Sequence, residues 1–225
     1  MSAGTLPANE VRTMFDRIAP VYDVMNRVMT AGLDLRWRRK TAEAVVRPGD
    51  RVLDACCGTG DLAVACVRAG GKVTGLDFSP RMLERARRKS QVVTWVEADL
   101  LALPWADGSY EAATVGFGVR NVTDLPKALA ELARVLVPDG RVGILEITTP
   151  RGMLAPFYRV WFDRIVPLIG RALKERTAYS YLPASVRRFP DAEELAKRLR
   201  AAGFQHVAYR TFAGGIVALH TGTKA

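Results

Sequence analysis

The chain has 225 residues, of which 49% are hydrophobic and 25% charged, a composition typical of a soluble globular protein. Its formal net charge at pH 7 is +10, so a nucleic acid and an anionic membrane surface are the partners that its charge favours. Two histidines and three cysteines without zinc-ligand spacing exclude a His/Cys metal centre, and no apolar stretch is long enough to form a signal-peptide core or a membrane span.

The first two thirds of the chain show helical signals followed by an alternation of strand and helix signals. Residues 1–45 look helical, and the alternation begins at Arg51. Ser79 and Pro80 mark a helix start, because Ser is a favoured N-cap and Pro fits the first helical position. The expected strands cover 51–57, 72–78, 92–98, 110–118 and 141–148, and the expected helices cover 61–69, 80–90 and 123–137. This rhythm predicts a mostly parallel sheet with helices on both faces.

The last third of the chain begins with a segment that breaks this rhythm. Residues 150–190 are rich in aromatic, apolar and Arg side chains. Asp191 and Glu194 then form a capping-box pattern for a helix over 192–202, which Gly203 ends. Runs with strand character follow at 204–212 and 216–223, with Gly214-Gly215 between them. They predict a hairpin whose last strand is antiparallel, within a single domain that covers 1–225.

A glycine-rich loop, Gly58-Thr59-Gly60, follows the first strand. Glycines let a ligand approach the backbone closely, and the spacing also fits the dinucleotide pattern, which alone is weak evidence. A dinucleotide would place its pyrophosphate at the start of the next helix. Asp61 stands at that helix start and Asp54 just before the loop, and we expect these carboxylates to repel a pyrophosphate. S-adenosylmethionine carries an ammonium and a sulfonium instead, and is therefore favoured.

Further acidic residues follow the second and third strands. Asp77 is placed to accept hydrogen bonds from both ribose hydroxyls, and Asp99 from the adenine amino group. The competing interpretations are a turn residue for Asp99 and a helix cap for Asp61. Ligands of open α/β sheets bind at the carboxyl ends of the strands, so acids at successive strand ends favour the binding site.

These features resemble class I methyltransferases over roughly residues 45–225. Residues 22–26 (YDVMN), followed by Trp37, are similar to the first signature of the menaquinone/ubiquinone C-methyltransferase family. Residues 116–122 (GFGVRNV) are similar to the segment that this family has after the fourth strand. Residues 134–146, with Arg134-Val135-Leu136, Pro138, Gly140 and Glu146, are similar to its second signature. The chain departs from the family at Asp34, where His is usual, at Val137 and Asp139, where Lys and Gly are usual, and at Gly116, where many relatives have Ser.

The resemblance implies a Rossmann-like, seven-stranded enzyme that transfers a methyl group from S-adenosylmethionine to a ring carbon of demethylmenaquinol, the last step of menaquinone biosynthesis. The alternatives are a dual-specificity enzyme that also methylates the benzoquinol of the ubiquinone pathway, and a methyltransferase acting on RNA or another small molecule. The product of the methyl donor is S-adenosylhomocysteine. The residues expected to bind the donor are Asp54, Gly58, Thr59, Gly60, Asp77, Phe78, Asp99, Leu100 and Gly116.

Methylation of an aromatic carbon needs an electron-rich ring, which a hydroquinone supplies. We expect Arg120 to stabilise the developing phenolate. Asn121 either orients a ring oxygen or caps the helix near Thr123, and Tyr22 is either a substrate-pocket hydroxyl or a core tyrosine. His206 and His220 are interpreted as structural, no residue is assigned as the general base, and no metal is expected.

The substrate expected from the resemblance is a prenylated hydroquinone, which resides in lipid. Residues 153–182, with apolar and aromatic side chains interleaved with Arg159, Arg164 and Arg171, are predicted to form a lid together with the N-terminal helices. The alternative is an ordinary insert helix packed on the sheet edge. We expect a cytoplasmic protein with reduced cysteines and peripheral contact at the inner face of the cell membrane, without nucleic acid. The sequence predicts no particular oligomeric state.

Overall fold

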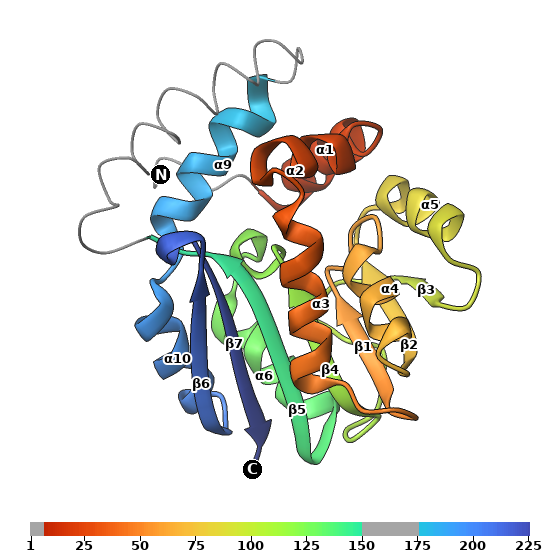
Figure 1. Ribbon diagram of the computed structural model, residues 1–225, viewed down its shortest axis with the longest axis vertical. Coiled ribbons are helices and arrows are strands. Elements are labelled where there is room, and N and C mark those ends of the chain that lie inside the picture. The colour runs from red at the N-terminus through yellow and green to blue at the C-terminus, as the bar shows by residue number, and fades with distance from the viewer. Residues whose placement is uncertain (1–6, 150–175) are drawn as a thin grey trace.

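The computed structural model describes residues 7–149 and 176–225, whose strands form one seven-stranded sheet in the order β3-β2-β1-β4-β5-β7-β6 (Figure 1). Strands β1 to β5 pair in parallel, and β7 runs antiparallel to both of its neighbours, β5 and β6. The strands are β1 (Arg51–Ala55), β2 (Lys72–Asp77), β3 (Thr94–Glu97), β4 (Tyr110–Gly116), β5 (Leu136–Ile147), β6 (Phe204–Phe212) and β7 (Val217–Lys224). The predicted mostly parallel sheet with an antiparallel last strand is confirmed.

Several strand boundaries differ from the prediction, and two of the differences have a clear structural cause. Strand β1 ends at Ala55, because Cys56 takes a left-handed conformation with φ of 53° that extended backbone does not allow. Strand β5 begins at Leu136, where pairing with Tyr110 starts the ladder ahead of a register shift. The turn predicted at residues 138–140 is therefore a bend inside the strand, with φ of 60° at Asp139.

The helices follow the predicted order. They are α1 (Ala8–Ile18), α2 (Tyr22–Thr30), α3 (Leu33–Val45), α4 (Asp61–Arg68), α5 (Pro80–Lys89), α6 (Leu125–Val135), α9 (Arg176–Arg188) and α10 (Ala192–Ala201). The predicted caps Ser79 and Asp191 accept the backbone N–H groups of Met82 and Glu194. Helix α6 is capped by Asp124, so Asn121 does not serve as its cap.

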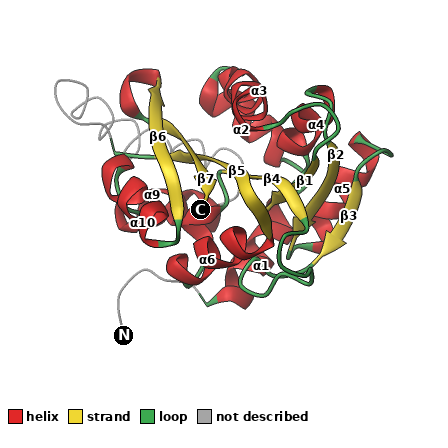
Figure 2. Ribbon diagram, turned by 90° about the horizontal axis from the view of Figure 1, so that it is seen from below, coloured by secondary structure: helices red, strands yellow, loops and turns green. Residues whose placement is uncertain are grey.

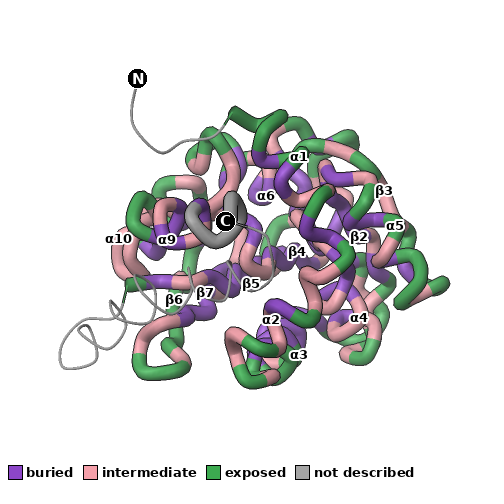
Figure 3. The backbone as a smooth tube through the Cα atoms, turned by 90° about the horizontal axis from the view of Figure 1, so that it is seen from above, coloured by how far each residue is buried: buried purple, intermediate pink, exposed green. Residues whose placement is uncertain are grey.

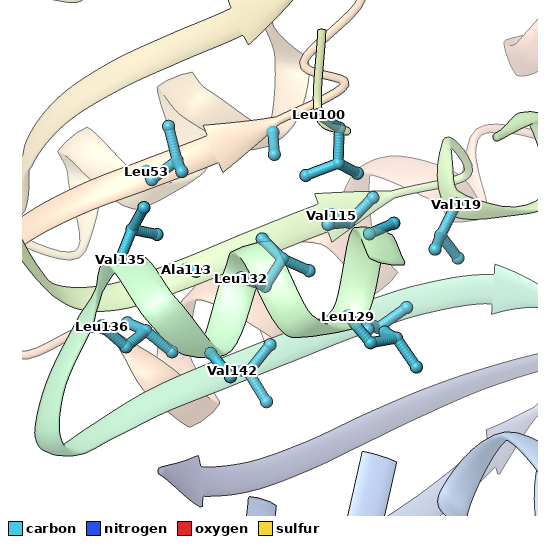
Figure 4. Close-up of a cluster of buried hydrophobic side chains, with 14 of the residues drawn as sticks. Leu53, Leu100, Ala113, Val115, Val119, Leu129, Leu132, Val135, Leu136 and Val142 are labelled. Carbon is cyan, nitrogen blue, oxygen red and sulfur yellow. The ribbon is translucent and has the colours of Figure 1, made fainter. Parts of the chain in front are cut away.

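The helices cover both faces of the sheet (Figure 2), with α3 and α4 on one face and α6 and α10 on the other. The largest buried cluster joins β1, β4 and β5 to α6 (Figure 4), including Leu53, Val115, Leu129, Leu132 and Val142. Burial is greatest along these central strands (Figure 3). The sheet is therefore a rigid support for side chains at its ends.

Helices α1, α2 and α9 lie above the carboxyl ends of the parallel strands (Figure 1). Val11, Met14 and Ile18 of α1 share a buried cluster with Tyr181 and Val186 of α9. Residues 153–175 of the predicted lid lie outside the described residues. Within residues 7–149 and 176–225, no helix has the length and hydropathy needed to cross a bilayer.

Candidate active site

Two neighbouring cavities lie at the carboxyl ends of the parallel strands. The first, here called the sheet-end cavity, is formed by the loops after β1, β2, β3 and β4. The predicted cofactor residues that line it are Gly58, Thr59, Asp77, Phe78, Asp99, Leu100 and Gly116, and the predicted catalytic residues Tyr22 and Asn121 line it too. Asp54 and Gly60 do not line it, and Arg120 lines the second cavity instead.

Asp77 ties the end of β2 to the glycine-rich loop. Its carboxylate accepts the backbone N–H of Gly58 at 2.8 Å and that of Ser79 at 2.9 Å. The side chain is buried, and burial raises the pKa of Asp77 to about 6, against the opposing effect of these N–H groups. Each oxygen retains a lone pair, so the carboxylate can still accept hydrogen bonds from a ligand in the cavity.

The two glycines of the loop have different surroundings. Gly58, with φ of 56°, faces open space: a Cβ built on it meets only Cε1 of Tyr22, at 3.9 Å. Gly60, with φ of 86°, backs onto Trp95, whose Cη2 would lie 2.5 Å from such a Cβ. Gly58 therefore leaves room for a ligand beside the backbone, whereas Gly60 lets the loop pack on β3.

The structure corrects the electrostatic argument made for Asp54 and Asp61. Asp54 is buried beneath the loop and accepts a hydrogen bond from Oγ1 of Thr114 at 2.8 Å. Burial raises the pKa of Asp54 to about 7. Asp61 does line the sheet-end cavity, but Arg27 Nη2 at 2.6 Å and Lys89 Nζ at 2.7 Å occupy its oxygens. Asp54 therefore does not face a ligand, and two cations balance the charge of Asp61. The sequence alone did not reveal this burial or these partners.

Asp99, which follows β3, and Asn121, which follows β4, both line the sheet-end cavity. Asp99 accepts the N–H of Leu101 at 2.9 Å, so it is a turn residue and a cavity residue at once. Asn121 lies in a short 3-10 helix, Val119–Asn121, after β4. Its buried Oδ1 has no hydrogen-bond partner among the described residues, which leaves an acceptor for a ligand.

The second cavity, here called the apolar cavity, has a volume of about 370 Å³. It falls in the usual size range of small-molecule sites, about 300–1,000 Å³. Its walls come from α1, α2, the start of α3, α9 and the segment before β7, and include Met14, Ile18, Met25, Met29, Trp37, Tyr181 and Ile216. Most of these side chains are hydrophobic, so the cavity suits an apolar ligand.

Arg120 is the main charged group of the apolar cavity. Its Nη1 donates to Oε1 of Glu146 at 2.7 Å and to the carbonyl oxygen of Phe117 at 2.6 Å. Burial is the largest single effect and lowers the pKa of Arg120, but the charge and hydrogen bond of Glu146, together with Tyr22 and Tyr181, outweigh burial and the pKa is raised. Glu146 holds the guanidinium in place and balances its charge, while the buried Nε has no hydrogen-bond partner among the described residues.

The two cavities are adjacent, because Phe15, Tyr22 and Phe117 line both of them. Phe117 has φ of 61°, a conformation that is rare for an aromatic residue, and Arg38 lies 5.1 Å from the centre of its ring. A group bound in one cavity can therefore face a group in the other across these three side chains. Sequence reasoning placed Tyr22 here but did not identify Phe15 or Arg38.

The remaining polar candidates lie elsewhere. His220 Nε2 contacts the carbonyl oxygen of Ala192 at 2.8 Å, and His206 lies in β6 with φ of 50°. Neither histidine lines either cavity. In the part of the chain that is described, no group of three or more His, Cys, Asp and Glu side chains could hold a metal ion.

Comparisons with known proteins agree with this architecture. The model of the ubiE/COQ5 methyltransferase family matches residues 4–224. The demethylmenaquinone methyltransferase of Thermus thermophilus is 44% identical, over 94% of this chain and 100% of its own. The ubiquinone/menaquinone biosynthesis C-methyltransferase UbiE of Desulfotalea psychrophila is 43% identical, over 95% of this chain and 90% of its own. A solved SAM-dependent methyltransferase of Thermotoga maritima has the same fold, with a TM-score of 0.70 at 21% identity over 95% of this chain and 99% of that one.

Proposed function

The chain belongs to the ubiE/COQ5 methyltransferase family, and we propose that it transfers a methyl group from S-adenosylmethionine to a ring carbon of demethylmenaquinol. The names of its relatives support this substrate, since proteins more than 40% identical over nearly the whole chain are demethylmenaquinone methyltransferases. The single observation that carries the proposal is the contact between the two cavities at Tyr22 and Phe117. Methyl transfer needs a donor site and an acceptor site that open onto each other.

The sheet-end cavity has the groups that S-adenosylmethionine requires. Asp77 offers a carboxylate to the ribose hydroxyls, and the open side of Gly58 admits the rest of the molecule. Phe78 and Leu100 supply apolar walls for the adenine ring, with Asp99 beside them. When bound, the donor supplies an electrophilic methyl carbon on a positively charged sulfur.

The apolar cavity fits a hydroquinone ring, and Arg120 is the group placed to act on it. A phenolic hydroxyl has a pKa of about 10, so a hydrogen bond from this guanidinium to the oxygen favours the phenolate and raises the electron density on the ortho carbon. That carbon forms the new bond to the methyl group as the carbon–sulfur bond breaks and its electron pair stays on the sulfur. The ring carbon then releases its proton to solvent, which restores the aromatic ring. Tyr22 and Phe117 hold the two reacting faces together and exclude water.

A methyl-transfer assay with a radiolabelled donor tests this function. Reduced demethylmenaquinone should be labelled and the oxidised quinone should not, because only the reduced ring is electron-rich. The reduced benzoquinol precursor and bulk RNA are the comparison substrates. Labelling of the benzoquinol as well would establish dual specificity. Labelling of RNA without labelling of either quinol would contradict the proposal.

The proposed substrate carries a prenyl tail, so its supply requires contact with a membrane. We therefore extend the proposal to a peripheral association with the inner face of the cell membrane. The net charge of +10 supports contact with an anionic leaflet.

A further inference from the structure

We propose that the corner between α2 and α3 is the surface that docks on an anionic lipid bilayer and admits the prenyl tail. This surface, the α2–α3 corner, consists of Val24, Val28, Ala31, Leu33 and Leu35. The inference rests on the proposed function, since it assigns a membrane to the same substrate site.

Large apolar side chains are exposed at this corner. Val24 and Val28 are 62% and 60% exposed, and Leu33 and Leu35 are 43% and 48% exposed. They include four of the six large hydrophobic side chains that are exposed in the described part of the chain. Val24 and Val28 lie one turn apart on α2 and share a face of that helix, and exposed apolar patches mark interaction sites.

The corner is continuous with the apolar cavity. Val28, Ala31 and Leu33 line that cavity and are exposed at the same time, so they form its rim. The turn is tight, because Ala31 and Gly32 both take left-handed conformations with φ of 50° and 76°. An apolar chain that leaves the cavity over this rim would pass directly onto exposed apolar side chains.

The charges around the corner favour an anionic surface. Arg36 and Arg39 are exposed on α3, and Lys40 is partly exposed beside them. The only acidic residue between Val24 and Ala42 is Asp34, which is buried and paired with Arg27 and Arg38. Arg39 forms an ion pair of 3.5 Å with Glu43, and both side chains are exposed. Because such an exposed pair contributes little stability in water, the arginine remains available to lipid.

The spacing of these residues suits a bilayer interface. Along a helix each residue rises about 1.5 Å, so Arg39 lies about 6 Å along α3 from Leu35. Apolar faces of interfacial helices enter about 5–10 Å into the boundary between head groups and acyl chains. Arg36 and Arg39 have long side chains that can reach phosphate groups while the neighbouring leucines contact the acyl chains.

Vesicle sedimentation with the full chain tests the proposal. The vesicles contain either phosphatidylcholine alone or phosphatidylcholine with phosphatidylglycerol. We expect binding to the anionic vesicles that weakens with salt. Val24→Asp/Leu35→Asp should weaken it by at least about tenfold, or about 1.4 kcal/mol, and Arg36→Gln/Arg39→Gln should remove the preference for anionic lipid. Val24 and Leu35 line neither cavity, so methylation of a short-tailed, water-soluble quinol should be unchanged.

The matched control is Val92→Asp, since Val92 is 73% exposed in the loop between α5 and β3. This variant should bind vesicles like the unmodified protein. The docking proposal is overturned if the unmodified protein stays in the supernatant with both vesicles, or if Val24→Asp/Leu35→Asp binds as well as it does. It is also overturned if that variant converts a dimer into a monomer on gel filtration without a loss of vesicle binding. Vesicle binding without methylation of any quinol would instead contradict the proposed function alone.

Discussion

Arg120 and Glu146 form an ion pair of 2.7 Å between the end of β4 and the end of β5, with side chains only 8% and 2% exposed. Glu146 also accepts the backbone N–H of Arg120 at 3.2 Å, so it fixes both ends of this residue. The guanidinium has little freedom to turn away from the apolar cavity. Glu146 is thus a positioning residue for the charge that we assign to the reaction.

Arg120→Ala should lower the rate of methyl transfer by about 10²-fold, the usual effect of removing one charge-stabilising donor. The affinity for S-adenosylmethionine, measured by calorimetry, should change little because Arg120 does not line the sheet-end cavity. Arg120→Lys should rescue poorly, since an ammonium does not reproduce the planar guanidinium.

The same substitution leaves Glu146 buried without its partner, which typically costs about 3–5 kcal/mol of stability. The control is therefore Arg120→Ala/Glu146→Ala, which removes both charges and should recover much of the thermal stability but none of the rate. A double variant that turns over like the unmodified enzyme would contradict the catalytic role of Arg120.

The affinity for S-adenosylmethionine should depend on pH through Asp77. Burial raises the pKa of Asp77 to about 6 in the free protein, and the ionised form is the better acceptor for ribose hydroxyls. Affinity should therefore be nearly constant above about pH 7, fall around pH 6, and decrease by up to about tenfold per pH unit at lower pH. Calorimetry between pH 5 and 8 measures this fall in affinity. The midpoint of the fall should lie within about one pH unit of the pKa of Asp77.

Asp77→Asn should bind at least about tenfold more weakly at pH 7.5, because charge-assisted hydrogen bonds contribute about 1.5–3 kcal/mol each, and should show no fall near pH 6. Asp54, with a pKa raised to about 7, provides the comparison because it does not line the cavity. If Asp54→Asn removes the pH dependence and Asp77→Asn keeps it, the assignment is wrong.

The two loop glycines should respond in opposite ways to alanine. Gly60→Ala should destabilise the fold by about 1–3 kcal/mol, because its methyl group meets Trp95, and thermal melting measures this. Gly58→Ala meets no atom closer than 3.9 Å, so its fold should tolerate the methyl group apart from the strain of a positive φ. Its cofactor affinity should fall instead, and an unchanged affinity would show that no ligand lies against Gly58.

Most of the fold could be predicted because its signals are local. Ser79 before Pro80 and the alternation of apolar runs mark elements within a few residues of themselves. The start of β5 was missed because Leu136 pairs with Tyr110, a contact between distant parts of the chain. The strand-end acids Asp77 and Asp99 could be placed in one cavity because the topology of a parallel sheet brings its carboxyl ends together.

The partners of the site could not be predicted in the same way. Arg27 lies 34 residues from Asp61 and Lys89 lies 28 residues from it, and no periodicity connects them. Tyr181 lines the apolar cavity from α9. The aromatic composition of the preceding segment did not predict which of its side chains would face a cavity. Ion pairs that form through tertiary packing cannot be predicted from the local sequence around each strand end.

The charges beside the glycine-rich loop are balanced. Asp61 pairs with Arg27 and Lys89, Asp23 also pairs with Lys89 at 2.7 Å, and Asp34 pairs with both Arg27 and Arg38, so three carboxylates face three cations. Removal of one member therefore leaves a net charge of known sign at the wall of the sheet-end cavity. Such a charge acts on a cationic ligand through space, and salt screens it.

Asp61→Asn should weaken S-adenosylmethionine binding by roughly fivefold, about 1 kcal/mol, because it leaves an excess positive charge beside a cationic ligand. Lys89→Met should strengthen binding by a similar factor, because it leaves an excess negative charge. Calorimetry at low and high salt measures both, and both effects should shrink as salt rises. Two changes of the same sign would mean that the residues act by holding the loop in shape, since only an electrostatic effect reverses with the sign of the charge removed.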